Sequence, residues 1–155
     1  PSGLRGIKGT TFEGGIRVPC IVHWPGKLPA GVTTDQVSLM FDLTASMARV
    51  AGVKLPAGRT FDGIDVLARL ENKQPDLART VFWRGRRGQN NWKAAREDSL
   101  KYVVQTVSGT NKIEGLYDIA ADMGEKNDLL ANRPADAERL RRLLTAWEKE
   151  VAPVR

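Results

Sequence analysis

The chain has 155 residues, of which 41% are hydrophobic and 27% charged. The length is enough for one ordinary domain with its own core, and the composition is not that of a disordered or fibrous chain. The sequence has no run of about 18 apolar residues, so no membrane span is predicted. A net charge of +6 and a pI of about 9.8 favour anionic partners such as nucleic acid, acidic glycans or sulfate esters, with an ordinary solvated basic surface as the alternative.

The N-terminal stretch, residues 1–15, is rich in glycine and predicts a loop of unusual backbone geometry. The chain does not begin with Met, so we expect it to be a piece of a longer protein, and a missing signal peptide then says nothing about location. The apolar, β-branched run 16–24 ends at Pro25-Gly26. It predicts a strand buried on both faces.

The chain holds a single cysteine, Cys20, and a single histidine, His23, and both fall in this apolar run. One cysteine excludes an internal disulfide, and one histidine leaves little room for a zinc site. We expect Cys20 to be a core residue, because a free cysteine in an apolar strand behaves as a small hydrophobe. We expect His23 to be a packed or capping residue rather than a base.

Two helices are predicted in the middle of the chain. Residues 37–51 carry apolar side chains at helical spacing, and Gly52 stands where a helix-terminating glycine is expected. Residues 65–71 predict one short helix after a turn-rich connection.

The second half of the chain predicts an antiparallel meander followed by a helix. The strands are expected at 80–83, 92–96, 100–107 and 114–119, separated by Gly and Asn. A helix is expected over 134–151, with Pro134 in its first turn and an ion pair between Glu138 and Arg142. Its apolar stripe should cover the meander; the stripe consists of Leu140, Leu143, Leu144, Trp147 and Val151.

Three segments in order resemble the sulfatase family. Residues 3–19, with Lys8, Glu13 and the sequence Gly-Gly-Ile-Arg-Val-Pro, are similar to that family's G-K-x-x-x-(aromatic)-E-G-G-x-R-V-P pattern, and Trp-Pro-Gly at 24–26 continues it. Residues 41–46 stand where the family reads D-L-x-P-T, with Ala-Ser in place of Pro-Thr. The last segment, 116–127, is similar to the family's L-Y-D-L…D-P…E…N pattern, with Met123 in place of Pro.

The resemblance implies an α/β fold. We expect residues 1–75 to be the C-terminal end of an alkaline-phosphatase-like α/β catalytic domain. Residues 76–155 are expected to form an antiparallel-sheet subdomain with a terminal helix, α+β in character. The family's Cys/Ser-x-Pro-x-Arg motif, whose first residue becomes formylglycine, is absent from this sequence, as are its paired aspartate metal ligands. The expected protein is therefore the C-terminal portion of an arylsulfatase-type enzyme and is inactive alone.

The resemblance also implies partners and a cofactor. The substrate is expected to be a sulfate ester, and calcium is expected in the full-length parent with no ligands in this chain. The other expected partner is the N-terminal catalytic part of the same protein; a membrane is not expected, nor is nucleic acid. The localisation is open, with a periplasmic or secreted parent as the expectation.

Lys8 is the one residue of this chain to which the resemblance assigns a catalytic and substrate-binding role, as the lysine that contacts the sulfate. An ammonium offers a compact charge with three donors, which suits an anionic ester. Without the surrounding motif, Lys8 would be interpreted as a solvated loop residue. Glu13 and Arg17 are expected to form a buried structural ion pair that anchors the loop to the following strand.

A different class of function stays open in the basic stretch 84–92, Arg-Gly-Arg-Arg-Gly-Gln-Asn-Asn-Trp. Positive charge beside an aromatic ring is what single-stranded nucleic acid binding requires. The same stretch is also compatible with a solvated hairpin loop, or with a loop that lines the parent's substrate cleft. A third possibility is a purely structural subdomain with no ligand of its own.

Overall fold

The computed structural model describes residues 3–151, except for the side chain of Asn111; Pro1 and Ser2 of the expected glycine-rich loop lie outside the described residues. The chain forms two compact units. The sheet unit combines the residues up to Pro19 with those from Ala78 onward, and the helical unit comprises Cys20–Leu77. The N-terminal segment thus packs with the C-terminal sheet, although the expected domain boundary at 75/76 assigns it to the other part of the chain. No helix among the described residues is long and apolar enough to cross a membrane.

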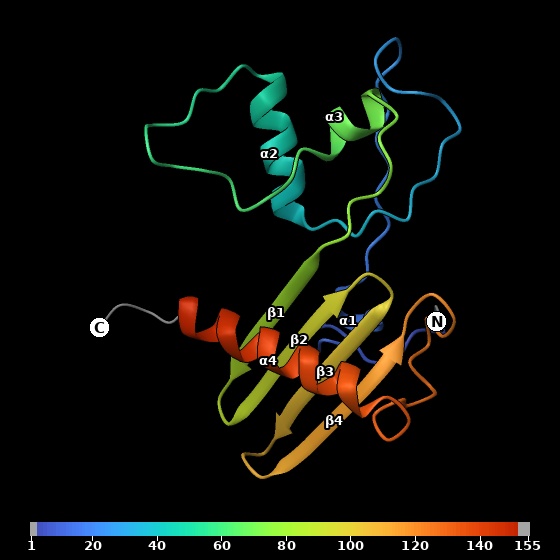
Figure 1. Ribbon diagram of the computed structural model, residues 1–155, viewed down its shortest axis with the longest axis vertical. Helices are drawn as coiled ribbons and strands as arrows, with labels where there is room; N and C mark the ends of the chain where they lie inside the picture. Colours follow the sequence, from blue (N-terminus) through green and yellow to red (C-terminus); the bar gives the residue numbers. More distant parts are fainter. Residues whose placement is uncertain (1–2, 152–155) are drawn as a thin grey trace. The chain divides into compact units, whose positions relative to one another are not determined.

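The predicted meander is confirmed (Figure 1). Its strands are β1 (Thr80–Arg87), β2 (Asn90–Glu97), β3 (Leu100–Val107) and β4 (Asn111–Asp118), all antiparallel in the order β1-β2-β3-β4. β3 has the predicted bounds, whereas the other three strands differ by a few residues at their ends. In the register, Val103 lies opposite Ala94 on one side and Gly115 on the other.

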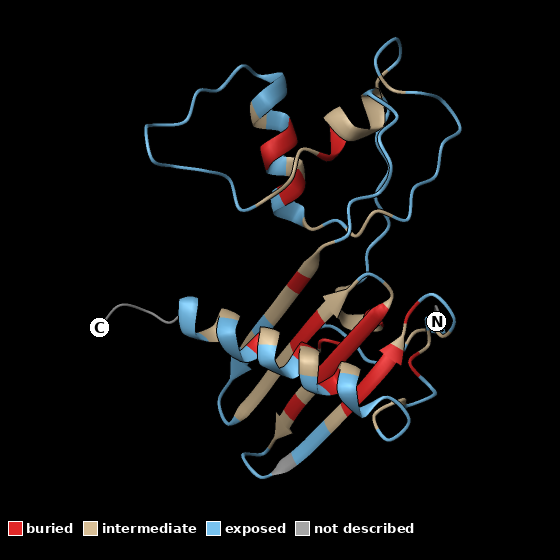
Figure 2. Ribbon diagram, viewed as in Figure 1, coloured by how far each residue is buried: buried red, intermediate tan, exposed pale blue. Residues whose placement is uncertain are grey.

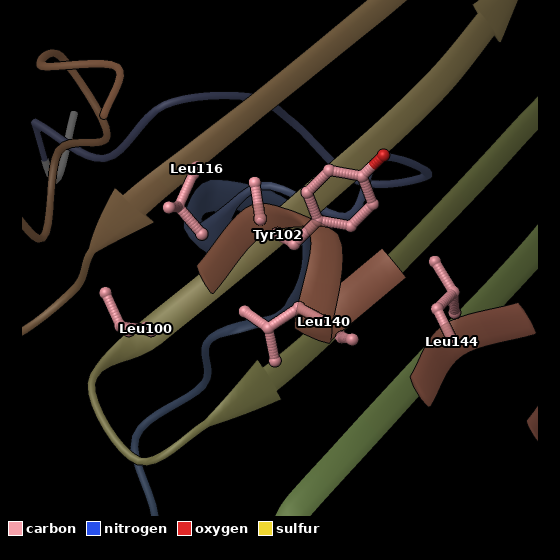
Figure 3. Packing of buried hydrophobic residues seen from close by; sticks show 7 residues of the cluster. Leu100, Tyr102, Leu116, Leu140 and Leu144 are labelled. Atoms are coloured by element: carbon pink, nitrogen blue, oxygen red, sulfur yellow. The ribbon is translucent and has the colours of Figure 1, made fainter. Parts of the chain in front are cut away.

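Helix α4 (Pro134–Glu150) lies across one face of this sheet, with Pro134 in its first turn as predicted. Leu140 is completely buried, and Leu144 nearly so, against β2 and β3. Figure 3 shows Leu140 among the side chains of Leu100, Tyr102 and Leu116 from the sheet. Leu140 and Leu144 of the predicted stripe belong to the core of the unit, Leu143 and Trp147 are partly buried against it, and Val151 is exposed. The buried core consists of Ala95, Leu100, Tyr102, Leu116, Ala137, Leu140 and Leu144.

One ion pair of α4 differs from the sequence-based prediction. Glu138 pairs with Arg141, three residues on, rather than with Arg142. Arg141 also lies over the ring of Tyr102 and pairs with Glu114 of β4. Trp147 is only partly buried, and its ring stacks on Phe82 of β1 at 5.1 Å between centroids.

The opposite face of the sheet is covered by the N-terminal segment, which contains the one-turn helix α1 (Glu13–Ile16). Phe12 from this segment packs edge-on against Tyr117 in a second buried cluster with Ala94, Val103 and Ile119. The sheet consequently has apolar residues buried against both faces. Figure 2 shows the buried residues of the strands as red segments. Sequence periodicity did not predict α1, because two of its residues are glycines.

The helical unit contains α2 (Met40–Val50) and α3 (Val66–Glu71), both near their predicted positions. Gly52 ends α2 with a φ of +68°, as expected for a helix-terminating glycine. Asp42 is fully buried and accepts hydrogen bonds from the backbone N–H groups of Leu39 (2.6 Å) and Ile64 (2.9 Å). This carboxylate therefore both caps α2 and ties it to the segment before α3.

The predicted buried strand over 16–24 is wrong: Ile16 ends α1, and the segment after it is neither strand nor helix. Ile21 is 92% exposed, and Cys20 and His23 are exposed too, so neither is the packed residue that was predicted. A strand forms only by pairing with a neighbour, and none of the described strands pairs with this segment.

Candidate functional site

Lys8 lies at the tip of a tight turn in the N-terminal segment. The backbone N–H and the hydroxyl of Thr10 both donate to the carbonyl of Ile7, at 3.1 Å and 2.8 Å. Gly9, inside this turn, has a φ of +90°, a conformation that favours glycine. Lys8 is exposed, and within the described part of the chain it makes no hydrogen bond or ion pair.

The paired glycines of α1 allow this turn to pack directly on the helix. A Cβ on Gly14 would lie 2.5 Å from the carbonyl oxygen of Arg5, and one on Gly15 would lie 2.3 Å from that of Thr10. The N–H of Gly14 donates to the Arg5 carbonyl at 2.7 Å. Only glycine permits such an approach, so the Gly-Gly pair seen in the sequence is required by the geometry of the loop that carries Lys8.

Arg5 anchors the N-terminal end of this loop. Its Nη1 donates to the hydroxyl of Tyr117 at 2.8 Å and to the backbone carbonyl of Glu125 at 3.0 Å. The guanidinium also lies over the ring of Phe12, 4.1 Å from the centroid, which is a cation–π contact. Burial raises the pKa of Tyr117, although the charge of Arg5 opposes the shift.

A buried charge cluster anchors the other end of the loop. Nζ of Lys101, on β3, lies 2.8 Å from Oε1 of Glu13 and 2.9 Å from Oε1 of Glu125. The side chains of Lys101 and Glu125 are fully buried, and that of Glu13 is 3% exposed. The other carboxylate oxygen of Glu125 accepts a 2.7 Å hydrogen bond from the backbone N–H of Glu13. We call these three residues the Lys101 cluster.

The two carboxylates of the Lys101 cluster differ in pKa. Burial opposes the charge of Glu13, but the ammonium of Lys101 and hydrogen bonds from Lys101 and Arg17 outweigh it, so the pKa of Glu13 is lowered. For Glu125, burial dominates and raises the pKa despite the attraction of Lys101. Glu13 is therefore the more firmly ionised of the two, with Arg96 4.0 Å from it as a further cation.

The sequence predicted part of this arrangement. The Glu13–Arg17 pair exists at 3.1 Å, but the side chain of Arg17 is 42% exposed, so the predicted buried ion pair is only half buried. The deeper partner of Glu13, Lys101, was missed, because a lysine in a strand is usually solvated. The signal that could have found it is the alternation of β3, which places Lys101 on the same face as the buried Val103.

The expected basic loop at 84–92 does not exist as a loop. Arg84 and its neighbours belong to β1, and the connection to β2 is the two-residue turn at Gly88 and Gln89. The guanidinium of Arg84 lies over Trp147, 5.8 Å from the ring centroid. Trp92 packs beside Gly85 on the neighbouring strand. These contacts are internal to the sheet unit, and none of them favours nucleic acid binding.

The described residues do not fit a metal site. No group of three or more His, Cys, Asp or Glu side chains among residues 3–151 could hold an ion. The acidic residues near the loop, Glu13 and Glu125, are already paired with Lys101.

No family model matches the chain. Individual curated proteins do match it. The sequence is 30% identical over 142 residues to N-acetylgalactosamine-6-sulfatase of Canis lupus familiaris, covering 77% of this chain and 27% of that protein. It is 40% identical over 75 residues to arylsulfatase G of Rattus norvegicus, covering 48% of this chain and 14% of that protein.

Solved structures extend the similarity to nearly the whole chain. The crystal structure of Ps i-CgsB superposes with a TM-score of 0.79 at 26% identity, covering 93% of this chain and 31% of that one. A structure from a Bacteroides thetaiotaomicron locus for the metabolism of multiple glycosaminoglycans, BT33336S-sulf, gives a TM-score of 0.72 at 25% identity, covering 95% and 32%. The chain thus spans about a third or less of the length of each of these four proteins.

Proposed function

Because this chain belongs to the sulfatase family, we propose that it is the C-terminal portion of an arylsulfatase-type sulfuric-ester hydrolase and supplies Lys8 to the site that binds the sulfate. The observation that carries the proposal is the geometry of the loop between Arg5 and Glu13, which we call the Lys8 loop. The loop is anchored at Arg5 and at Glu13, yet Lys8 at its tip is exposed and unpaired within the described residues. An exposed cation on a fixed loop is suited to meet an anionic ligand.

Lys8 would act on the ester by charge. A sulfate ester spreads negative charge over its oxygens, and an ammonium offers three donors to them. As the S–O bond breaks, charge develops on the leaving oxygen, and a cation held in place stabilises this transition state more than the ground state. The net charge of +6 would add a general attraction for anionic substrates.

The nucleophile and the metal would come from elsewhere in the enzyme. We propose that the nucleophile is a formylglycine and that the metal is a divalent cation, namely calcium. Both would be held by the N-terminal catalytic part. The described residues hold no ligand set for such an ion. The chain alone is therefore expected to be inactive.

The N-terminal catalytic part would pack on apolar surface that this chain leaves exposed. In the helical unit, Ile21 is 92% exposed, and Met40 and Met47 of α2 are 73% and 62% exposed. Exposed apolar surface of this kind typically marks an interaction site. The partner proposed here is the segment by which the matched sulfatases exceed this chain in length.

Replacing Lys8 in the full-length enzyme that contains this chain tests the proposal. Lys8→Ala should lower kcat/KM for a sulfate ester by roughly 10²–10³, the size of effect seen when one donor is removed from a site of charge development. Lys8→Arg should restore little of it, because a planar fork does not replace a point charge. The control is Lys54→Ala, another exposed lysine outside the loop, which should leave kcat/KM unchanged.

The proposal is contradicted if kcat/KM for Lys8→Ala stays within about twofold of wild type. Lys8 would then contribute under about 0.5 kcal/mol of transition-state stabilisation and would not act on the sulfate.

A further inference from the structure

We propose that Lys101 and Glu125 are positioning residues for Lys8: by holding Glu13, they fix the loop that presents the lysine to the sulfate. This inference rests on the proposed function of Lys8. Neither residue lies in that loop, since Lys101 is on β3 and Glu125 follows β4. Lys101 acts on Lys8 through Glu13, and Glu125 acts both through Glu13 and through its backbone carbonyl, which accepts a hydrogen bond from Arg5.

The burial of the Lys101 cluster is hard to explain by stability alone. Three ionised or ionisable groups are withdrawn from water at the place where the N-terminal segment meets the sheet. Desolvation of such groups offsets most of their mutual attraction, and well-packed apolar side chains often serve stability as well. The charges instead restrict the position of the Glu13 side chain. Lys101 lies between the carboxylates of Glu13 and Glu125, so the carboxylate of Glu13 is held at the ammonium of Lys101.

Glu125 is itself held in an unusual conformation. Its backbone φ is +52°, a conformation that residues other than glycine rarely adopt. Such a conformation persists only where the surrounding structure enforces it. Asp122 enforces this one by accepting 2.7 Å hydrogen bonds from the N–H groups of Lys126 and Asn127. The result is a carboxylate directed at the backbone N–H of Glu13.

The two anchors of the Lys8 loop meet at Glu125. Its backbone carbonyl accepts from Arg5 at one end of the loop, and its carboxylate accepts from the N–H of Glu13 at the other. The loop is thereby closed onto a single residue of the β4–α4 connection. A small displacement at Glu125 or Lys101 would shift the whole loop, and misplacement of a catalytic group by about 1 Å can cost roughly 10²-fold in rate.

A double-mutant cycle in the full-length enzyme separates positioning from general stabilisation. Lys101→Met keeps the length of the side chain and removes its charge, and it should lower kcat/KM roughly 10- to 100-fold. If Lys101 acts through Lys8, Lys101→Met in a Lys8→Ala background should have an effect of less than about twofold. Equal fold-losses in both backgrounds would show that Lys101 does not act through Lys8.

Because Lys101→Met leaves two buried carboxylates without their cation and the protein can fail to fold, Glu125→Gln provides a second variant. Glutamine keeps an oxygen for the N–H of Glu13 but removes the ion pair with Lys101. Arg139→Gln, which breaks the partly exposed pairs of Arg139 with Asp136 and with Glu97 of β2, is the control for loss of ion pairs outside the Lys101 cluster.

The readout for Glu125→Gln is amide hydrogen exchange in the 155-residue chain itself, so the result does not depend on sulfatase activity. If Lys8→Ala proves neutral in the enzyme, the proposed function fails, while this measurement still decides whether the cluster fixes the loop. We expect the amides of Gly14 and Gly15 to exchange at least tenfold faster in Glu125→Gln, with those of β3 unchanged. Unchanged exchange at both glycines, or equal acceleration throughout the sheet unit as a general loss of stability would give, would overturn the proposal.

Discussion

At the scale of single residues, the charges that organise the sheet unit are those that local sequence predicts least well. Lys8 and Glu13 were recognisable because they lie in a motif, and Glu13 has a structural role as expected. Lys101 was not recognisable, because its role depends on two carboxylates far away in sequence, Glu13 and Glu125, which only the fold brings together. A lysine in a strand carries no local mark that distinguishes a buried ion pair from a solvated side chain.

A second charge cluster gives a prediction about acid stability. Glu114 of β4 is hydrogen-bonded to Tyr102 and paired with Lys112 and Arg141. Burial alone would raise the pKa of Glu114, but the hydrogen bonds from Lys112, Tyr102 and Arg141 lower it to about 2. Burial and the bond to Glu114 raise the pKa of Tyr102 to about 12.

Because the pKa of Glu114 is lower in the folded than in the unfolded state, its stabilising contribution is fully present above the ordinary value of 4.5 and is lost as the pH falls toward 2. Glu114→Gln should cost about 1 kcal/mol at pH 7, in the range for a partly exposed pair, and almost nothing near pH 2. Urea unfolding of both proteins at pH 7, 4 and 2.5, followed by tryptophan fluorescence, measures this. A difference between the two proteins that stays constant over this pH range would contradict the assignment.

At the scale of elements, the sequence predicted what local periodicity determines. The meander and α4 were predicted because alternation and helical spacing are properties of each segment by itself. The segment 16–24 was not, because its apolar composition indicates burial while burial depends on a neighbour that the described residues do not supply. The spacing in α2 correctly predicted a helix, but the buried side chains of α2 are Asp42, Ala45 and Ser46, while Met40 and Met47 are exposed.

The packing of α4 predicts how its residues contribute to stability. Leu140 is fully buried against the sheet, so Leu140→Ala should cost roughly 2–5 kcal/mol of the free energy of unfolding. Trp147 is partly buried, and Trp147→Ala should cost less than the roughly 3–5 kcal/mol of a fully buried tryptophan. Denaturant titration followed by circular dichroism measures these values.

Arg142→Ala is the control on the same helix. Arg142 is exposed and is not the partner of Glu138, so its replacement should stay within about 0.5 kcal/mol of wild type. A cost for Leu140→Ala as small as that of Arg142→Ala would show that the stripe does not pack on the sheet.

At the scale of the whole molecule, the two units differ in how completely they bury their apolar residues. The sheet unit has apolar cores on both faces of its sheet. In the helical unit, large apolar side chains are exposed, among them Ile21, Met40, Met47 and Val53. In the proposed enzyme, these residues would pack against the N-terminal catalytic part, which would also supply the nucleophile and the metal.

The hydrolysis of a chromogenic aryl sulfate in the presence of calcium tests this account most directly, measured for the 155-residue chain and for the full-length enzyme that contains it. The account predicts turnover by the enzyme and none by the chain, because the nucleophile and the metal would come from the N-terminal catalytic part. Metal-dependent turnover by the chain alone, retained through purification and abolished by Cys20→Ala, would contradict it.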